Sequence, residues 1–179
     1  YDNIFHIYKK EMYAYLYSFI QKIILKKSLN KDAGNLLRIS KFQNIIDIGC
    51  GESDVLNYFK ISKNQKYFGF EIDDYFVKKL KKKYKKKNFY FSKKNINEID
   101  FRKFNPKKTI ILLIGIFHHI DDLKIKLFLS KTKNFKVLSI DAVILPRQNL
   151  ITRLLFYLDN GNFIRKLKKI MTLALMYMV

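Results

Sequence analysis

The hydrophobic residues near the start of the chain recur at helical intervals. Between positions 4 and 27 they follow one another in steps of one, three and four residues, and lysines occupy much of the remainder. This spacing predicts an amphipathic helix, because it places the apolar side chains on one face. The polar segment Asn30–Gly34 then predicts a break. We expect residues 1–40 to form a helical cap, on which Tyr8 and Tyr13 either belong to a lid or pack in the core.

From Phe42 onwards the pattern alternates between short apolar runs and helical repeats. The runs typical of strands are Asn44–Ile48, Lys66–Phe70, Asn88–Phe91, Thr109–Ile114 and Lys136–Val143. Helical repeats lie between them, at Val55–Phe59, at Phe76–Tyr84, after Asp121 and Asp122, which are suited to cap a helix, and at Leu150–Leu158. The uninterrupted run Thr109–Ile114 is typical of a strand buried on both faces. The alternation predicts a doubly wound, Rossmann-like α/β domain over residues 41–179, with a mostly parallel sheet and helices on both faces.

The composition fits one folded domain and excludes a disordered chain, a membrane-spanning helix and a disulfide-linked or cysteine-metal protein. The chain has 179 residues, of which 49% are hydrophobic, so it is not a disordered segment. Its longest apolar stretches, Thr109–Ile116 and Ile170–Val179, are too short to span a bilayer. Cys50 is the only cysteine, which excludes an intrachain disulfide and a cysteine metal cluster. No signal peptide is visible, and we expect a cytoplasmic protein without a metal.

The net charge of +21 suggests an anionic partner, but the kind of basic residue argues against a simple interpretation. Of the 36 basic residues only five are arginines. Arginine is preferred for bidentate recognition of phosphates and bases. The chain is also rich in Lys, Ile, Asn, Phe and Tyr, as a bias towards A and T codons would produce. We therefore interpret the charge mainly as solvated surface and keep nucleic acid as an alternative partner.

Candidate chemistry begins in the segment Asn44–Ser53. An apolar run ends in Asp47-Ile-Gly-Cys-Gly51, and a helical pattern follows from about Ser53. Gly49 and Gly51 allow a sharp turn and close approach of a ligand to the backbone. A helix beginning near Ser53 would direct its N–H groups towards that ligand. This order of strand, turn and helix predicts a nucleotide-type cofactor at the carboxyl end of the strand.

Two further segments point to the same edge of the sheet. Glu71 ends the next predicted strand, 20 residues after Gly51, where a carboxylate accepts hydrogen bonds from a ribose diol. The segment Gly115-Ile-Phe-His-His-Ile-Asp-Asp122 directly follows the fourth predicted strand. Because carboxyl ends of parallel strands face the ligand crevice, this segment is expected to line the reactive end.

These three motifs together resemble the class I S-adenosylmethionine-dependent methyltransferases. The resemblance covers roughly Phe42 to Arg165, and the later piece Asp159-Asn-Gly-Asn-Phe-Ile-Arg165 is similar to a bacterial subgroup whose substrates are largely unassigned. The resemblance implies S-adenosylmethionine as cofactor and S-adenosylhomocysteine as product. It also implies a cofactor site in which Asp47, Gly49 and Gly51 hold the methionine part and Glu71 holds the ribose. Asn95 and Ile96 would flank the adenine, and Gly115 and Ile116 would lie near the sulfonium. Cys50 and Ile72 are expected among the residues that bind the cofactor.

The chain departs from the family pattern at three places. Ser53 stands where many members have a third glycine, which suits the turn if the backbone there is helical. Asn95 stands where many have an acid, and its carbonyl oxygen can accept from the adenine amino group. After Arg165 only Leu167–Val179 remains, which is too little for the sixth and seventh strands of the fold. We therefore expect the C-terminal strands to be missing.

The histidines after the fourth strand are the catalytic candidates. His118 and His119 have a side-chain pKa suited to a general base. In an extended segment adjacent side chains point in opposite directions, so we expect one of the two to face the pocket. Asp141, at the end of the fifth predicted strand, is a further candidate for the pocket. Cys50 we interpret as a small packing residue rather than a nucleophile.

Other functions are compatible with parts of this pattern. Hydride transfer on NAD expects a third glycine where the chain has Asp54, whose carboxylate would repel a pyrophosphate. Methylation of a flipped base expects an Asn/Asp-Pro-Pro-aromatic turn, which the chain lacks after the fourth strand. We predict methyl transfer to a small molecule or to a cell-envelope sugar or lipid precursor. RNA methylation and a non-catalytic binding module remain the alternatives, and the oligomeric state is open.

Overall fold

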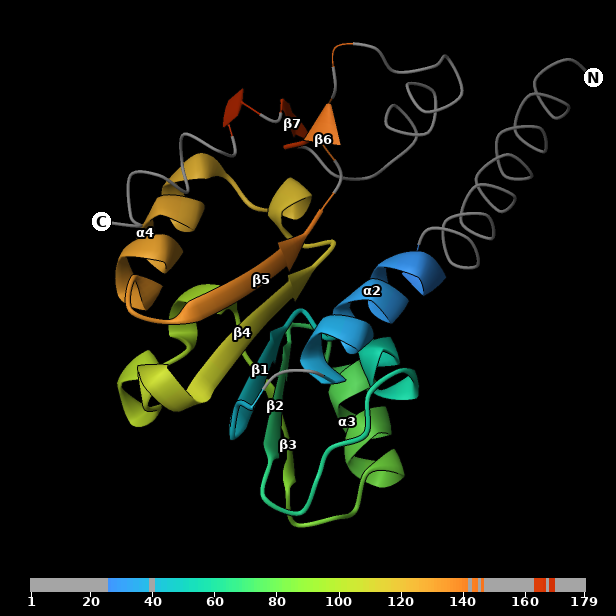
Figure 1. Ribbon diagram of the computed structural model, residues 1–179. Helices are drawn as coiled ribbons and strands as arrows, with labels where there is room; N and C mark the ends of the chain where they lie inside the picture. Colours follow the sequence, from blue (N-terminus) through green and yellow to red (C-terminus); the bar gives the residue numbers. More distant parts are fainter. Residues whose placement is uncertain are drawn as a thin grey trace, which may run out of the picture.

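The computed structural model describes residues 26–38, 41–141, 143–144, 146, 163–166 and 168–169 (Figure 1). Most of the predicted N-terminal helix, with Tyr8 and Tyr13, lies outside these residues, as does the predicted helix Leu150–Leu158. The expectation about the closing strands also falls largely outside them. No helix in the described part of the chain is long and apolar enough to cross a membrane.

The first described helix, α2 (Lys26–Arg38), contradicts the predicted break at Asn30–Gly34. The helix continues through this segment because its buried face rests on the domain. Ala33 and Leu37 are fully buried in the core. A Cβ atom at Gly34 would lie 2.6 Å from Tyr58 Cβ. The glycine therefore weakens the helix locally but permits its close packing on the segment around Tyr58.

The main sheet has five parallel strands in the order β3-β2-β1-β4-β5. Their bounds are β1 Asn44–Ile48, β2 Lys66–Glu71, β3 Phe89–Lys93, β4 Thr109–Ile114 and β5 Lys136–Ile140. The short strands β6 (Val143–Ile144) and β7 (Arg165–Lys166) pair separately. This confirms the predicted Rossmann-like α/β fold.

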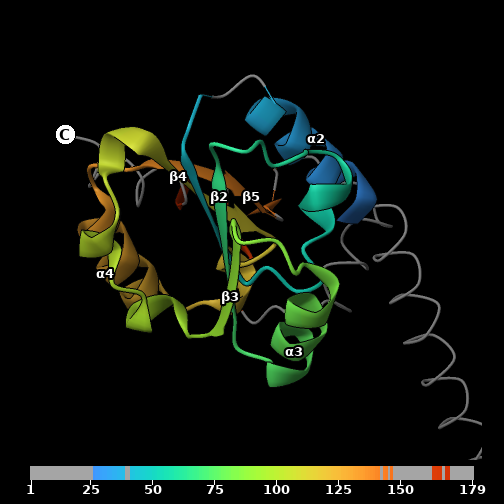
Figure 2. The same cartoon turned by 90° about the horizontal axis from the view of Figure 1, so that it is seen from below.

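Helices cover both faces of this sheet, as Figure 2 shows from below. Helices α2 and α3 (Asp74–Lys83) lie on one side, and α4 (Asp122–Thr132) lies on the other. Single turns of 3-10 helix complete the connections: η2 Asp54–Asn57, η3 Ile96–Glu98, η4 Phe101–Lys103, η5 Pro106–Lys108 and η6 Phe117–His119.

The two cores follow the alternation of side chains along the central strands. Ile45 and Leu112 are fully buried on the side of α2 and α3, whereas Ile46 and Ile111 are fully buried on the side of α4, around Phe128. Successive strand residues point to opposite faces, so a strand covered on both sides is mostly apolar. β4 is apolar after Thr109, and β1 is apolar apart from Asn44 and the buried Asp47. The bounds of both strands agree with the predicted ones.

Two predicted elements end earlier than expected. The helix predicted at Val55–Phe59 is only the single turn η2. The strand predicted to reach Val143 stops at Ile140. Asp141 leaves the sheet because its carboxylate accepts the backbone N–H of Phe117, in the loop after β4. This bond positions an ionisable side chain at the carboxyl edge.

Candidate functional site

The turn after β1 uses left-handed backbone at three positions. The φ angles are +64° at Gly49, +50° at Gly51 and +55° at Ser53. The N–H groups of Gly49 and Cys50 both donate to the carbonyl of Phe70, at 2.7 and 3.1 Å, and so fasten the turn to the end of β2. The glycines are required because this conformation is strained for residues with a side chain.

The structure corrects the predicted role of Ser53. Its backbone is left-handed, with φ 55° and ψ 44°, and not helical. A side chain in this conformation costs about 1–2 kcal/mol, and Ser53 is held there by nearly complete burial. Only the single turn η2 follows, so no long helix directs a dipole at the site. The turn itself, rather than a helix N-terminus, forms this part of the site.

Glu71 joins the turn to the end of β2. Its Oε2 accepts the N–H of Gly51 at 2.8 Å, while its Oε1 accepts the N–H groups of Ile72 at 2.8 Å and Asp73 at 3.2 Å. Three backbone donors therefore fix the orientation of a carboxylate that is only 9% exposed. The neighbouring Ile72 side chain is 65% exposed, which leaves an apolar surface beside this carboxylate.

Asp47 is buried under the turn and is bonded to a tyrosine. The Tyr67 hydroxyl donates to Asp47 Oδ2. Burial, and then the charge of Asp47, raise the pKa of Tyr67 well above its usual value, so the phenol keeps its proton. Asp47 therefore fixes β1 to β2 as well as lying beneath the glycine turn.

Cys50 packs as predicted. Its side chain is buried. A Cβ atom added to Gly69 would lie 2.9 Å from Cys50 Sγ, so the sulfur packs closely against this glycine. Burial is the largest cause, and the charge of Asp47 the next, of a strong increase in the pKa of this thiol. A protonated thiol is a poor nucleophile.

We therefore expect Cys50 to resist alkylation. Iodoacetamide at pH 8 should label the folded protein at least about 100-fold more slowly than the same protein unfolded in urea, because the thiolate fraction and access both fall. Mass spectrometry of a labelling time course measures both rates. Rapid labelling of the folded protein would show that the turn opens readily.

Gly115 and Ile116 occupy the facing wall. Gly115 has φ +67°, and its N–H donates to the carbonyl of Ile140 at 2.8 Å. Among the described residues, a Cβ atom here would meet only His118 Cε1, at 3.8 Å, so none of them fills the space above Gly115. By contrast, Ile116 Cδ1 would lie 2.1 Å from a Cβ atom at Gly49. The two segments predicted to share a site are therefore in direct contact.

Asn95 and Ile96 have structural partners. Asn95 caps η3, with its side chain accepting the N–H of Asn97 at 3.2 Å and its own N–H donating to Glu98 at 2.8 Å. Ile96 is buried in the core on the side of α4. The adenine contact predicted for these residues stays a prediction, and the buried side chain of Ile96 is packed in the core.

His118 and His119 lie differently from the prediction. Residues 117–119 form the 3-10 turn η6 and not an extended segment, so the two rings lie side by side with centroids 4.0 Å apart. His118 is buried, and its Nδ1 bonds to Asp141 Oδ1, whereas His119 is exposed. The other oxygen of Asp141 accepts the N–H of Phe117. Asp141 thus fixes both the ring of His118 and the backbone that carries it.

The network around Arg165, which holds the loop after β4, is not predicted by the sequence pattern, although Arg165 ends a segment that resembles the family. Its buried guanidinium donates to the carbonyls of Phe117 at 2.6 Å, Phe163 at 2.9 Å and Ile120, and to Asp122 Oδ1 at 2.7 Å. Lys169 and then Arg165 hold the pKa of Asp122 below its usual value. A single arginine 43 residues from its carboxylate gives no periodic signal in the sequence.

These contacts define the class of the protein. A parallel sheet in this order, with a glycine turn after β1, an acid at the end of β2 and a histidine after β4, is an α/β domain built to bind a nucleoside-containing cofactor at its carboxyl edge. Residues 46–128 match the family model described as Methyltransferase domain. The match and the fold agree with the resemblance to the class I S-adenosylmethionine-dependent methyltransferases seen in the sequence.

Solved structures share this fold at low sequence identity. A methyltransferase from Archaeoglobus fulgidus aligns with a TM-score of 0.65 and 18% identity, over 92% of this chain and 73% of that one. Mitomycin 7-O-methyltransferase MmcR gives 0.64 and 16%, and human N-acetylserotonin methyltransferase, solved with S-adenosylmethionine, gives 0.61 and 17%. The alignments cover 83% and 88% of this chain but only 46% of either of these two proteins, so the chain spans about half of their length. A comparison with curated protein sequences found no match.

Proposed function

We propose that the protein transfers a methyl group from S-adenosylmethionine to an acceptor whose reacting atom loses a proton. The observation that carries this proposal is the junction of Glu71, the glycine turn and the loop after β4 at one edge of the sheet. The residues present fit the cofactor. No described residue fills the space over Gly115, the carboxylate of Glu71 is oriented by three backbone donors, and the exposed Ile72 offers an apolar surface for a purine.

In this proposal each part of the edge contacts one part of the cofactor. Gly49, Cys50 and Gly51 form the wall for the methionine portion, with Asp47 beneath them. Glu71 accepts from the ribose hydroxyls, and the η3 cap at Asn95 borders the adenine. The nearby acids favour a cofactor that carries positive charge on sulfur over one that carries a pyrophosphate.

The sulfonium supplies an activated methyl group, so the chain's own task is to orient the acceptor and remove its proton. We propose His118 as the base and assign no such role to His119, which is exposed. Donation from His118 Nδ1 to Asp141 fixes the tautomer in which Nε2 carries the lone pair. Arg165 holds the backbone of the same loop at Phe117 and Ile120.

A small molecule or a cell-envelope sugar or lipid precursor is the acceptor class we propose. The names of two similar structures, mitomycin 7-O-methyltransferase and N-acetylserotonin methyltransferase, state small-molecule acceptors for those proteins. A proton-accepting histidine suits a hydroxyl acceptor, since a hydroxyl must lose its proton on methylation. We also propose a cytoplasmic location. The single cysteine of this sequence cannot form an intrachain disulfide, which fits a reducing compartment.

Calorimetry with S-adenosylhomocysteine tests the cofactor site through Glu71. We expect Glu71→Gln to weaken binding at least about tenfold, because the amide loses the charge that strengthens hydrogen bonds from the ribose. The 2′,3′-dideoxy analogue separates this contact from a general distortion of the turn. Its affinity should be low for the wild-type protein and nearly unchanged by the substitution.

Asp74→Asn is the matched control, since Asp74 is an exposed carboxylate on the next turn that pairs with Lys78. It should leave the affinity unchanged. Equal losses for both ligands in Glu71→Gln would contradict a ribose contact. Absence of binding to the wild-type protein at low salt would contradict the methyltransferase proposal as a whole.

A further inference from the structure

The charges of this domain are distributed unevenly between the two edges of the sheet. Every described Asp and Glu except Asp32 lies near the carboxyl end of a strand or in the connection that follows it. The described ion pairs gather in the same connections: the lysines and arginines that take part are Lys78, Lys79, Arg102, Lys124, Arg165 and Lys169. The acids thus lie mainly where the methyl-transfer site is proposed, and they neutralise the neighbouring cations.

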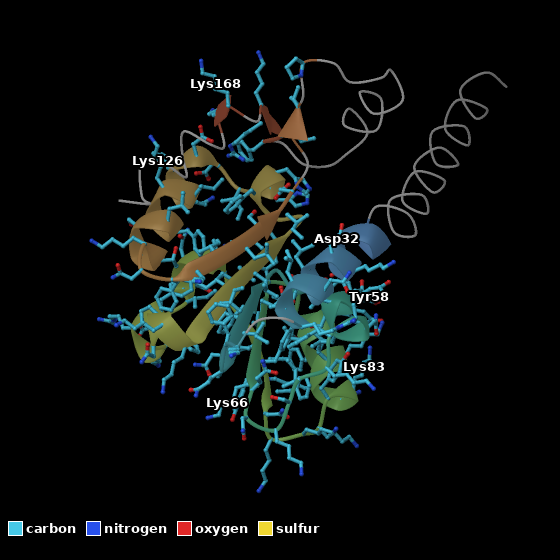
Figure 3. The ribbon with its side chains drawn as sticks, in the orientation of Figure 1. Asp32, Tyr58, Lys66, Lys83, Lys126 and Lys168 are labelled. Carbon is cyan, nitrogen blue, oxygen red and sulfur yellow. The ribbon has the colours of Figure 1, made fainter. Side chains whose placement is uncertain are left out.

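The opposite edge carries cations without acids. Each strand of the main sheet is entered through a segment that contains lysine and no Asp or Glu: 41–43, 58–65, 84–88, 103–108 and 133–135. Because the five strands are parallel, these segments meet at one edge. In Figure 3, Lys66 and Lys83 lie towards this edge, and Lys126 and Lys168 lie on the opposite side of the domain. Codon bias explains how many lysines the chain has, but not this separation.

The basic edge is hollowed by two adjoining grooves. The larger has a volume of about 900 Å³ and is lined in part by Arg38, Lys41 and Lys60. The smaller has about 560 Å³ and is lined in part by Lys41, Lys107 and Lys136. Lys41 and Phe42 line both, which makes them one continuous feature, here called the amino-edge groove. None of the described Asp and Glu residues lines either part.

The lysines of the amino-edge groove are not paired with acids in the part of the chain that the structure describes. Within the described residues, Lys41, Lys60, Lys107 and Lys136 form no ion pair with a carboxylate. The Lys136 ammonium lies 5.8 Å from the centre of the Phe42 ring, a cation–π contact at the junction of the grooves. Concentrated positive charge in a concave surface attracts polyanions strongly.

We propose that the amino-edge groove binds a single-stranded nucleic acid. Its lysines suit successive phosphates, and the half-buried rings of Phe42 and Tyr58 suit contact with bases along the same path. A bilayer surface fits this groove less well because the groove is concave. Among the described residues that line it, Leu36 is the only large apolar side chain that is exposed. The groove lies at the edge remote from His118, so the bound strand is a tether for the enzyme rather than the methyl acceptor.

Fluorescence anisotropy with a labelled oligouridylate of about 20 nucleotides tests this site. Contacts to about four phosphates predict a slope near −3 for log K against log salt, or about a fiftyfold loss of affinity between 50 and 200 mM salt. Lys41→Glu/Lys107→Glu/Lys136→Glu should weaken binding at 50 mM salt at least tenfold. The affinity for S-adenosylhomocysteine should not change, which keeps this test independent of the proposed function.

The matched control is Lys93→Glu/Lys126→Glu/Lys166→Glu, which changes the net charge equally with exposed or half-exposed lysines away from the groove. It should lower the affinity for the oligonucleotide by less than threefold. Equal losses in both triple variants would show that net charge and not the groove binds, and would overturn the proposal. So would the absence of oligonucleotide binding, or a stronger groove-dependent association with phosphatidylglycerol vesicles than with the oligonucleotide.

Discussion

Replacing Arg165 with methionine is expected to lower the free energy of unfolding by about 3–5 kcal/mol, because three backbone carbonyls lose the buried guanidinium that donates to them, whereas Asp122 keeps Lys169. Asp122 and the carbonyls of Phe117, Ile120 and Phe163 would lose their common donor. Each buried acceptor left unpaired costs about 1–3 kcal/mol. Urea denaturation measures the loss, and hydrogen exchange of residues 117–122 should rise more than that of β1.

Arg102→Met supplies the matched control for Arg165. Arg102 also pairs with an aspartate, Asp100, but its side chain is 91% exposed, so the change should leave the free energy of unfolding nearly unchanged. Arg165→Lys should recover little, since an ammonium cannot reach a carboxylate and three separate carbonyls in the geometry of a guanidinium. A loss below about 1 kcal/mol in Arg165→Met would mean that the loop holds its shape without the arginine.

Gly49→Ala is expected to destabilise the domain by about 2–4 kcal/mol and to weaken S-adenosylhomocysteine binding at least tenfold. A side chain at φ +64° costs about 1–2 kcal/mol, and the new methyl group would lie 2.1 Å from Ile116 Cδ1. Relief of this overlap requires movement of a packed side chain or of the turn, at a typical cost of about 1–3 kcal/mol. Denaturation and calorimetry on the same variant measure the two effects.

Gly115→Ala and a double variant separate the backbone cost of Gly49→Ala from the cost of its overlap with Ile116. Gly115 has a similar φ of +67° but no described residue fills the space above it, so Gly115→Ala should show the backbone cost of about 1–2 kcal/mol alone. The double variant Gly49→Ala/Ile116→Ala should lose less free energy of unfolding than the sum of the two single variants. Ile116→Ala removes Cδ1, the atom that overlaps the new methyl group. Strict additivity would show that Ile116 is not the cause.

The sequence predictions succeeded where the structure depends on residues close together in sequence, and they failed where it depends on contacts between distant residues. The bounds of β1 and β4 were predicted closely, because most residues of a strand buried on both faces are apolar. The break at Asn30–Gly34 was wrong, because Tyr58, distant in sequence, needs a glycine on α2 for close packing. The extended segment at His118 was wrong as well, since its fold depends on Asp141 and Arg165.

The sequence by itself determined the order of strands and helices, the glycine turn at Gly49 and Gly51, and the acid at Glu71, because each depends on residues close along the chain. The tertiary structure alone decided the backbone of Ser53, the choice of His118 over His119 as the buried ring, and the network of Arg165. It also decided that the described acids lie away from the edge where the strands begin. These features join segments far apart in sequence, and their energies arise from burial and from directional hydrogen bonds that exist only after the sheet has brought those segments together.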